Sequence, residues 1–413
     1  MYLPAVTLAL GTGIAAPAIP VFAKSFDVSV GTASLVFIVH MLGGLVAAIP
    51  TGYLADRVGR RKIVLTGPLL VALSSFLVAT SQSFEQLLVY RFIGGAAQQM
   101  WMLARLAIVA DTGGRNQRGR QITGMIGMET TGRLMGPAIG GFIAALWDVR
   151  APFIVHGILS LVAIIPSYKL VKETAPTLRN AEGRTGRNGA GTQRVTLAAL
   201  LVLPVLMFFA AQFFASLTRG TMFSGAIHLY PVYTYGVGPE AIGLVTTVAT
   251  AIGLPIVFST GAIMDRFGRK STIVPGFFLL SLALAAIAVT AFAGLPFEAY
   301  VVAYLLMQTA QSITSGNMQV LGTDIAPPHL RGRFFGIWRT VGEIGVALSP
   351  LCFGLLAETL GYGFSFAFLS STALIAAVIL MTQVKEPPKE PADNAARSSP
   401  PVTSIAAPVA TRS

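Results

Sequence analysis

Charged residues are scarce in this chain of 413 residues. They make up 11% of it, while hydrophobic residues make up 54%. A soluble globular domain carries about 25% charged residues. The composition therefore excludes an ordinary soluble fold and predicts an integral membrane protein that resides in a lipid bilayer.

Cysteine and the common catalytic patterns are also nearly absent. The one cysteine, Cys352, lies inside an apolar run, so the chain cannot form an internal disulfide. The sequence has no phosphate-binding loop, no metal-ligand cluster and no nucleophile–base pair in a recognisable context. We therefore expect no enzyme activity, no cofactor, no bound metal and no ATP-driven pumping.

Acidic residues are outnumbered by basic ones. The chain has 17 Asp and Glu against 29 Lys and Arg, which gives a net charge of +12. The basic residues are scattered through short loops and form no basic face with interleaved aromatic residues, so we expect no nucleic acid partner. We interpret the positive charge as a signal of membrane topology.

Long apolar runs are abundant. A run of about 20 apolar residues can cross the ~30 Å hydrocarbon core as a helix. The first run has no basic segment before it, so we expect a retained helix rather than a signal peptide. Twelve spans are predicted, at 2–22, 32–53, 63–80, 84–109, 121–146, 151–170, 201–232, 240–262, 272–293, 297–321, 334–357 and 363–384.

These spans predict an all-α fold with twelve transmembrane helices in two pseudo-symmetric six-helix bundles. The chain divides into four regions: an N-terminal bundle at 1–171, a cytoplasmic linker at 172–195, a C-terminal bundle at 196–384 and a disordered cytoplasmic tail at 385–413. Loops after the odd-numbered spans hold only Lys24 and Arg150, and the opposite loops hold most other Lys and Arg. Since positive loops stay cytoplasmic, we expect both termini there, in a multi-pass protein of the plasma (inner) membrane.

A dense group of charges interrupts the apolar runs twice. It stands between the second and third spans, at Gly52-Tyr-Leu-Ala-Asp-Arg-Val-Gly-Arg-Arg-Lys62, and again between the eighth and ninth, at Gly261-Ala-Ile-Met-Asp-Arg-Phe-Gly-Arg-Lys270. Two charged loops in matching places indicate a duplicated six-helix unit. Two such halves suit a transporter that rocks one half against the other around a midplane site.

The first charged loop, with the pattern Gly-x-Leu-x-Asp-Arg-x-Gly-Arg-Arg-Lys, resembles the hallmark loop of the major facilitator superfamily. Leu87-x-x-x-Arg91-x-x-Gly94-Gly95 in the fourth span resembles a second motif of that superfamily. The fifth span resembles the motif of its proton-coupled antiporters through Gly132-x-x-x-Gly136-Pro137-x-x-Gly140-Gly141. The resemblance covers all twelve spans and implies an exporter similar to the twelve-helix drug:proton antiporters.

The resemblance implies gating for the charged loops, which would latch the halves together and release as they rock. The gating residues are Gly52, Asp56, Arg57, Gly59, Arg60, Asp265, Arg266 and Arg269. The alternative is a purely topological anchor. The antiporter motif consists of Gly132, Gly136, Pro137, Gly140 and Gly141, and its spacing of four allows close helix packing. The resemblance adds that this packing seals the cytoplasmic side or guides the rocking.

Charges within the spans are costly, at ~2.5–3.5 kcal/mol each near a helix centre, so they point to a site. Glu129 and Glu343 each have an arginine four residues away on the same helical face, namely Arg133 and Arg339. Protonation of either glutamate would release its arginine, which makes these four residues candidates for proton coupling. Arg91 joins them through the resemblance. A permanently charged structural pair is the alternative.

Two further expectations concern charged residues in the spans. Many drug:proton antiporters carry an acid in the first span, whereas this chain has none there, so coupling would fall to spans five and eleven. Arg105 lies about one turn from the cytoplasmic end of its span, and we expect it to snorkel toward water.

Amide, methionine and aromatic side chains in the spans predict an adaptable cavity for small organic or amphipathic molecules. The same side chains could instead join helices to one another. The cavity candidates are Gln98, Trp101, Met102, Met128, Gln212, Arg219, Gln308, Gln311, Asn317 and Trp338.

The sequence as a whole predicts a monomeric secondary active transporter. It would export small organic molecules by alternating access, driven by protons. A metabolite uniporter or importer of the same fold is the first alternative, and a receptor or scaffold that does not transport is the second. The charged loops in both halves and the paired deep charges favour a protein with moving parts.

Overall fold

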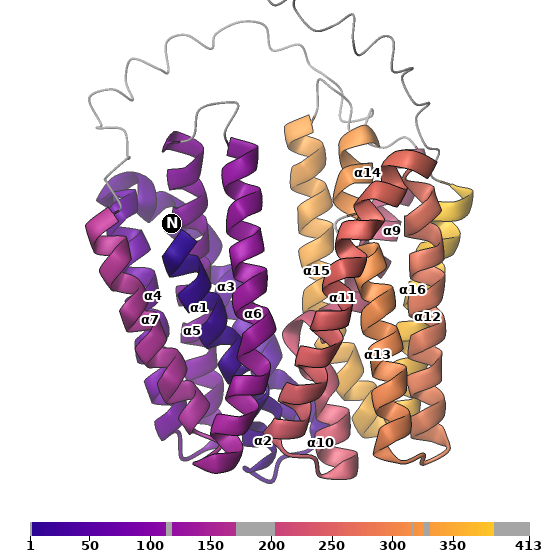
Figure 1. Cartoon of the computed structure of the whole chain (residues 1–413), viewed down its shortest axis with the longest axis horizontal. Helices are drawn as coiled ribbons and strands as arrows, with labels where there is room; N and C mark the ends of the chain where they lie inside the picture. The colour runs from indigo at the N-terminus through magenta and orange to yellow at the C-terminus, as the bar shows by residue number, and fades with distance from the viewer. Residues whose placement is uncertain (1, 113–117, 171–202, 316, 326–330, 384–413) are drawn as a thin grey trace, which may run out of the picture.

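The computed structural model describes residues 2–112, 118–170, 203–315, 317–325 and 331–383 (Figure 1). All regular elements in these ranges are helices, which confirms the all-α prediction. The predicted linker and tail lie outside the described residues.

The N-terminal half contains the first six spans, and its first span is divided at Pro17 into two helices. Its helices are α1 (Tyr2–Ala15), α2 (Ala18–Lys24), α3 (Val30–Val58), α4 (Arg60–Thr80), α5 (Phe84–Thr112), α6 (Arg118–Leu146) and α7 (Ala151–Leu170).

The C-terminal half contains the other six spans, and its fourth span is divided after Thr314. Its elements are α9 (Leu203–Ser224), the 3₁₀ turn η2 (Ala226–His228), α10 (Leu229–Tyr235), α11 (Pro239–Phe267), α12 (Lys270–Phe292), α13 (Phe297–Thr314), α14 (Asn317–Ile325), α15 (Arg331–Thr359) and α16 (Tyr362–Thr382). We call the end where α7 ends and α9 begins the linker end, and the opposite end the far end.

Length and composition alone identify nine apolar spans among the described helices. The predicted spans outside that set are α5, α6 and the divided pair α13 and α14. Among these helices, α5 carries Arg91 and Arg105, and α6 carries Glu129 and Arg133. Helices α5 and α6 therefore bring charge into the interior of the N-terminal half.

The charged motifs lie mostly within helices, which corrects the expectation of loops. Helix α3 continues to Val58 and α4 begins at Arg60, so Gly59 alone separates them. Gly59 has φ 104° and its counterpart Gly268 has φ 98°, a left-handed region that favours glycine. The glycines of the motif thus make the two turns, and the charges continue the helices.

Equivalent basic residues anchor both turns. The Arg61 guanidinium donates to the Tyr168 carbonyl near the end of α7 at 2.9 Å, and its Cζ lies 5.1 Å from the centroid of the Tyr168 ring. Lys270 donates to the Met381 carbonyl near the end of α16 at 3.0 Å. Cations are favourable beside the exposed carbonyls of a helix C-terminus. The duplication is therefore visible in contacts as well as in sequence.

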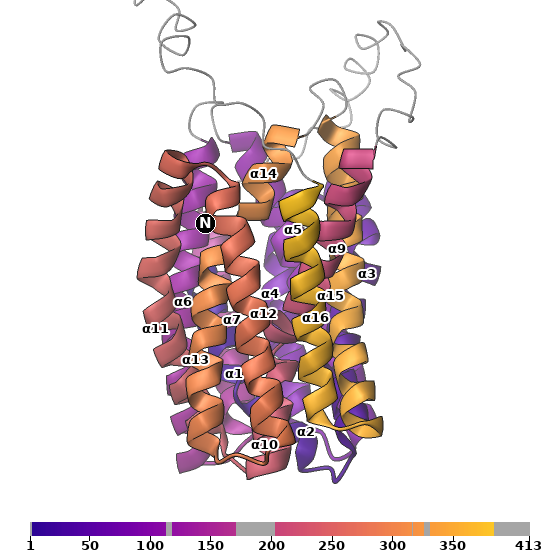
Figure 2. The ribbon, with the colours of Figure 1, turned by 90° about the vertical axis from the view of Figure 1, so that its right-hand side faces the viewer.

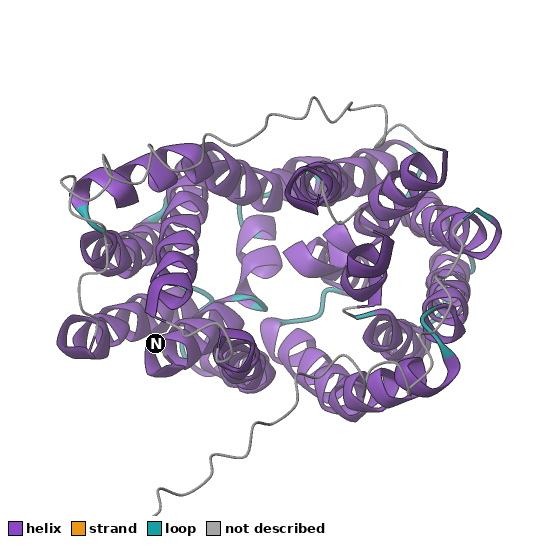
Figure 3. Ribbon diagram, turned by 90° about the horizontal axis from the view of Figure 1, so that it is seen from above, coloured by secondary structure: helices purple, strands orange, loops and turns teal. Residues whose placement is uncertain are grey.

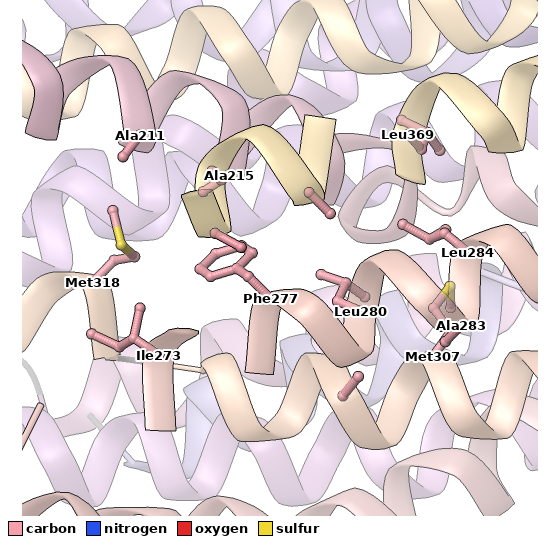
Figure 4. Packing of buried hydrophobic residues seen from close by; sticks show 14 of the residues in the cluster. Ala211, Ala215, Ile273, Phe277, Leu280, Ala283, Leu284, Met307, Met318 and Leu369 are labelled. Carbon is pink, nitrogen blue, oxygen red and sulfur yellow. The ribbon is translucent and has the colours of Figure 1, made fainter. Parts of the chain in front are cut away.

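A buried cluster fills the C-terminal half (Figure 4). Phe277 and Leu280 of α12 are fully buried, and Ala215 of α9 lies beside the Phe277 ring. Helices α12 and α16 run side by side (Figure 2), and the Ser281 hydroxyl donates to the Ser370 carbonyl at 2.9 Å. Small residues and short hydroxyl contacts let these helices approach closely, which is how helices associate in lipid.

The two bundles are distinct when seen from above (Figure 3). They meet where α6 packs on α11 and where α3 packs on α15. A Cβ at Gly243 of α11 would overlap the Pro137 carbonyl of α6, and the Ala138 N–H donates to Thr247 Oγ1 at 3.0 Å. Both contacts lie in the far-end part of these helices, so the halves are held closely together there.

Two reciprocal hydrogen bonds join the halves at the far end, where α2 and α10 meet in Figure 1. Lys24 donates to the Val232 carbonyl at 2.8 Å, and the Tyr233 hydroxyl donates to the Val28 carbonyl at 2.9 Å. Burial, with a smaller effect from Asp27, raises the pKa of Tyr233 to about 12, so the phenol keeps its proton. We call these two contacts the far-end latch.

Removal of the far-end latch should favour opening at this end. In the double variant Lys24→Met and Tyr233→Phe, each lost bond removes ~0.5–1.5 kcal/mol. We expect the open population to rise about tenfold. Spin labels on the α6–α7 and α12–α13 turns, in a Cys352→Ala background, report the distance between the two halves at the far end. Tyr235→Phe is the control, since its hydroxyl bonds to Leu295 within the C-terminal half. Equal distances in the latch variant and the control would contradict the prediction.

Candidate functional site

A cavity lies inside the N-terminal half, among α1, α4, α5, α6 and α7. Its wall combines apolar residues near the N-terminus with polar and charged side chains from the later helices. The lining residues are Ala5, Leu8, Ala9, Thr12, Val71, Gln98, Trp101, Glu129, Arg133 and His156. Two of the predicted cavity residues, Gln98 and Trp101, are in this wall, as are two of the proton-coupling candidates, Glu129 and Arg133.

An ion pair between α5 and α6 is the main electrostatic feature of the cavity. Arg105 Nη1 of α5 contacts Glu129 Oε1 of α6, and their side chains are 5% and 20% exposed. The Arg105 guanidinium also lies over the Trp101 ring, 4.1 Å from its centroid. Arginine suits this position because its flat, weakly hydrated guanidinium can stack and form an ion pair at once.

This ion pair corrects two expectations from the sequence. Arg105 does not snorkel but is buried, because its partner and its stacking ring both lie inside the bundle. Glu129 pairs with Arg105 of the neighbouring helix rather than with Arg133 of its own. The i, i+4 spacing within α6 identified Arg133 as a possible partner. The rotation of α5 against α6 instead places the more deeply buried Arg105 in contact with Glu129.

Arg133 lies one turn beyond Glu129 and also lines the cavity. Its side chain is exposed, and it makes no ion pair with any described carboxylate. Among the described residues, Arg105, Glu129 and Arg133 therefore leave one uncompensated positive charge at the cavity. An uncompensated charge within a span is costly, so Arg133 needs water or a ligand group.

His156 of α7 presents one ring nitrogen to the inside of the bundle. Its Nδ1 lies 3.1 Å from Ser75 Oγ, and the Ser75 hydroxyl donates to the Val71 carbonyl at 2.8 Å. We assign the Ser75 proton to the Val71 carbonyl, and with this assignment the ring Nδ1–H donates to Ser75 Oγ. The neutral ring then carries a lone pair on Nε2, which is buried without a partner among the described residues.

His40 of α3 forms a bridge between two positions of α5. Its Nδ1 lies 3.1 Å from the Arg91 carbonyl, and its Nε2 lies 3.2 Å from Gln98 Oε1. A Cβ at Gly95 would overlap the His40 carbonyl, so this close helix crossing depends on that glycine. The bridge fixes Gln98 at the cavity wall. Arg91 itself lies outside the cavity lining, and its Nε is buried with no partner among the described residues.

Arg219 of α9 has a structural partner in the C-terminal half. It donates to the Thr314 carbonyl at 2.7 Å and also to Thr314 Oγ1, and it lies over the Phe277 ring. Thr314 is the last residue of α13, so the cation sits at the end of a divided span, where free carbonyls favour positive charge. This contact compensates the buried charge without a carboxylate.

The predicted pair of α15 is present, but its surroundings differ from those of the α6 site. Arg339 Nε lies 3.7 Å from Glu343 Oε1, and both side chains are 56% exposed. Exposed pairs of this kind contribute ~0–1 kcal/mol. The repeat therefore does not produce equal sites, because the buried interhelical pair belongs to the N-terminal half.

The remaining cavity candidates are divided among several environments. Asn317 is buried and bonds to Thr272 Oγ1 and the Ile313 carbonyl, so it joins helices. Trp338 packs on Phe335 beside the C-terminal cluster. Gln212 bonds to Ser216 at 3.1 Å. The other candidates are Met102, Gln308 and Gln311, which are half-buried, and Met128, whose side chain lies outside the described residues.

The predicted gating residues surround the two turns at the linker end. Arg57 lies over the Tyr53 ring at 4.4 Å, and Arg266 lies over the Phe267 ring at 5.2 Å. Gly52 lies in the last part of α3, Arg60 begins α4, and Arg269 stands between α11 and α12. The side chains of Asp56 and Asp265 lie outside the described residues.

The glycines of the antiporter motif lie along the α1–α6 contact. Cβ atoms at Gly132, Gly136 and Gly140 would overlap the α1 backbone near Val6, Gly13 and Ile14 respectively. Gly141 instead faces Pro239 of α11, in the other half. The motif thus brings α6 close to α1 within its own half and close to α11 across the interface.

Sequence reasoning missed the contribution of Arg105, His156 and Ser75. A charged residue and a histidine inside predicted spans were available signals, because both are costly there. The role of Ser75 had no signal, since serine in an apolar helix usually bonds to its own backbone. Only the position of α7 beside α4 brings Ser75 to the histidine ring.

Comparison with known protein sequences extends these observations. A family model described as Major Facilitator Superfamily matches residues 1–350 and 208–412. The quinolone resistance protein NorA of Staphylococcus aureus is 30% identical over 164 residues, which is 40% of this chain and 42% of NorA. The uncharacterized MFS-type transporter MJ1560 of Methanocaldococcus jannaschii is 20% identical over 383 residues, which is 92% of this chain and 96% of that protein.

Solved structures with the same arrangement cover nearly the whole chain. A D-xylose-proton symporter superposes with a TM-score of 0.74 at 17% identity, over 93% of this chain and 97% of the other. The inward open conformation of the xylose transporter XylE from E. coli gives 0.72 at 18% identity, over 94% and 96%. At these identities the likeness establishes the twelve-span fold in two halves. With the family match along most of its length, the chain belongs to the major facilitator superfamily.

Proposed function

We propose that this transporter exports small organic or amphipathic molecules in exchange for protons. The observation that carries the proposal is the Arg105–Glu129 pair at the wall of an internal cavity. The pair is a charge-assisted contact that depends on an ionised carboxylate. A proton on Glu129 weakens it and leaves the Arg105 guanidinium in need of another partner.

Coupling requires that the proton and the substrate affect one another at this cavity. A neutral molecule that donates a hydrogen bond to the Glu129 carboxylate binds less well once Glu129 is protonated. By reciprocity, the bound molecule lowers the affinity of Glu129 for a proton by the same factor. This competition is what exchange of substrate for protons requires.

Alternating access is supported by the way in which the halves meet. The far-end latch and the α6–α11 contact close one end of the molecule. The charge distribution of the sequence supports a cytoplasmic linker end in the plasma membrane, and the structure would then face inward. Export is supported by the α6 motif and by the likeness to NorA, which is named for quinolone resistance.

Proton-driven import is the second candidate function. It is favoured by the fold likeness to a D-xylose-proton symporter. The two candidates differ in the direction of substrate flux relative to the proton gradient. Export in exchange for protons moves substrate against the direction of proton flow, whereas symport moves both in the same direction.

Proteoliposomes with an imposed proton gradient test the proposed function and the role of Glu129 together. We expect substrate flux opposite to the proton flux. Glu129→Gln should abolish gradient-driven flux, because the side chain cannot ionise, and should retain exchange of substrate across equal pH. Glu343→Gln is the matched control, since its pair is half exposed, and should transport as the unaltered protein does. Full gradient-driven flux in Glu129→Gln would rule out this carboxylate as the proton carrier.

A second prediction concerns stability in detergent. Arg105→Gln leaves a buried carboxylate without its cation and should lower the unfolding free energy by about 3–5 kcal/mol. The double variant Arg105→Gln and Glu129→Gln should recover much of this loss, because no charge is then left unpaired. Arg339→Gln in the exposed pair should cost less than about 1 kcal/mol. Denaturant unfolding followed by circular dichroism measures all three, and additive losses in the double variant would contradict the pairing.

A further inference from the structure

We propose that the N-terminal cavity binds a neutral group which both donates and accepts hydrogen bonds, such as a carboxamide or lactam. The inference rests on the proposed function, because it names the substrate class of the same cavity. It is carried by two buried polar atoms of opposite kind, Trp101 Nε1 and His156 Nε2. Both residues line this cavity, and both atoms lack partners among the described residues.

Trp101 supplies the donor. The residue is 7% exposed, and an indole nitrogen can only donate. Arg105 covers the face of the ring, so the N–H edge is the part left for a ligand. Gly67 of α4 fixes the indole position, because a Cβ there would lie 2.8 Å from the Trp101 Cβ. A ligand carbonyl oxygen can accept a hydrogen bond from this N–H.

His156 supplies the acceptor. With the Ser75 proton assigned to the Val71 carbonyl, the ring proton is on Nδ1 and the lone pair of the neutral ring is on Nε2. Ser75 is therefore a positioning residue that selects the tautomer. A ligand N–H or O–H can donate a hydrogen bond to this lone pair.

The charges of the cavity favour a neutral ligand group. Glu129 is already paired with Arg105, and a cationic ligand would be repelled by Arg105 and Arg133. A carboxylate would attract Arg133 but would offer no proton to His156 Nε2. A carboxamide meets all of these requirements, since its oxygen can accept from Trp101 or Arg133 while its N–H donates to His156.

Helix α4 contacts both residues that supply these atoms. Gly67 contacts Trp101, Val71 lines the cavity, and Ser75 contacts His156. These α4 residues follow one another at intervals of four, so they lie on one face about two turns, or roughly 12 Å, long. Gln98 lies in the same wall and is fixed by His40.

Binding of four naphthalene probes to the purified full chain tests the proposal. The probes are 1-naphthamide, N,N-dimethyl-1-naphthamide, 1-naphthoate and 1-naphthylmethylammonium, measured by isothermal titration calorimetry. The primary amide should bind about tenfold more tightly than each of the others, since each lacks one complementary hydrogen bond. Trp101→Phe removes the indole N–H, and Ser75→Ala removes the hydroxyl that fixes the His156 tautomer. Each variant should reduce this preference. Trp147→Phe is the control, because Trp147 is 76% exposed at the end of α6.

Several results would overturn the proposal. The first is equal affinity for the four probes. The second is tightest binding of 1-naphthoate, with that affinity lost in Arg133→Gln. The third is an unchanged preference for the amide in both Trp101→Phe and Ser75→Ala. Failure of the amide to bind at millimolar concentration would show that water alone satisfies the two atoms. Flux of the same probes in proteoliposomes separates the two proposals. An amide that binds as predicted while no probe is moved contradicts the transport function, and flux of other probes without amide binding contradicts only the substrate class.

Discussion

The close contact between Arg105 and Glu129 is the interaction on which the functional account depends. It joins α5 to α6 inside a bundle whose other contacts are mostly apolar or made by small residues. Each charge is stable there only because it is paired with the other, since an isolated charge within a span costs free energy. In the proposed mechanism, a proton on Glu129 would therefore change the energy of the contact between α5 and α6.

The two halves repeat the same charged motif but differ in their interior charges. The repeated turns, with Gly59 and Gly268 at left-handed φ, remain equivalent. The interior charges do not, because the N-terminal half holds a buried ion pair while the Arg219 charge of the C-terminal half is compensated at the end of α13. The two halves therefore compensate their interior charges in different ways.

Much of the fold could be predicted from the sequence, because apolar runs and a repeated motif are local signals. The candidate site was predictable only in part. The i, i+4 rule identified Arg133 for Glu129, but the observed partner depends on how α5 is rotated against α6. Ser75 and His156 meet only through the packing of α4 on α7. Such contacts depend on distances between helices, which one sequence does not specify.

Infrared difference spectroscopy of the purified protein tests the central claim most directly. The account predicts a protonated-carboxyl band that grows as pH is lowered, disappears in Glu129→Gln and persists in Glu343→Gln. A spectrum that is the same in Glu129→Gln as in the unaltered protein would contradict the claim that Glu129 takes up the proton.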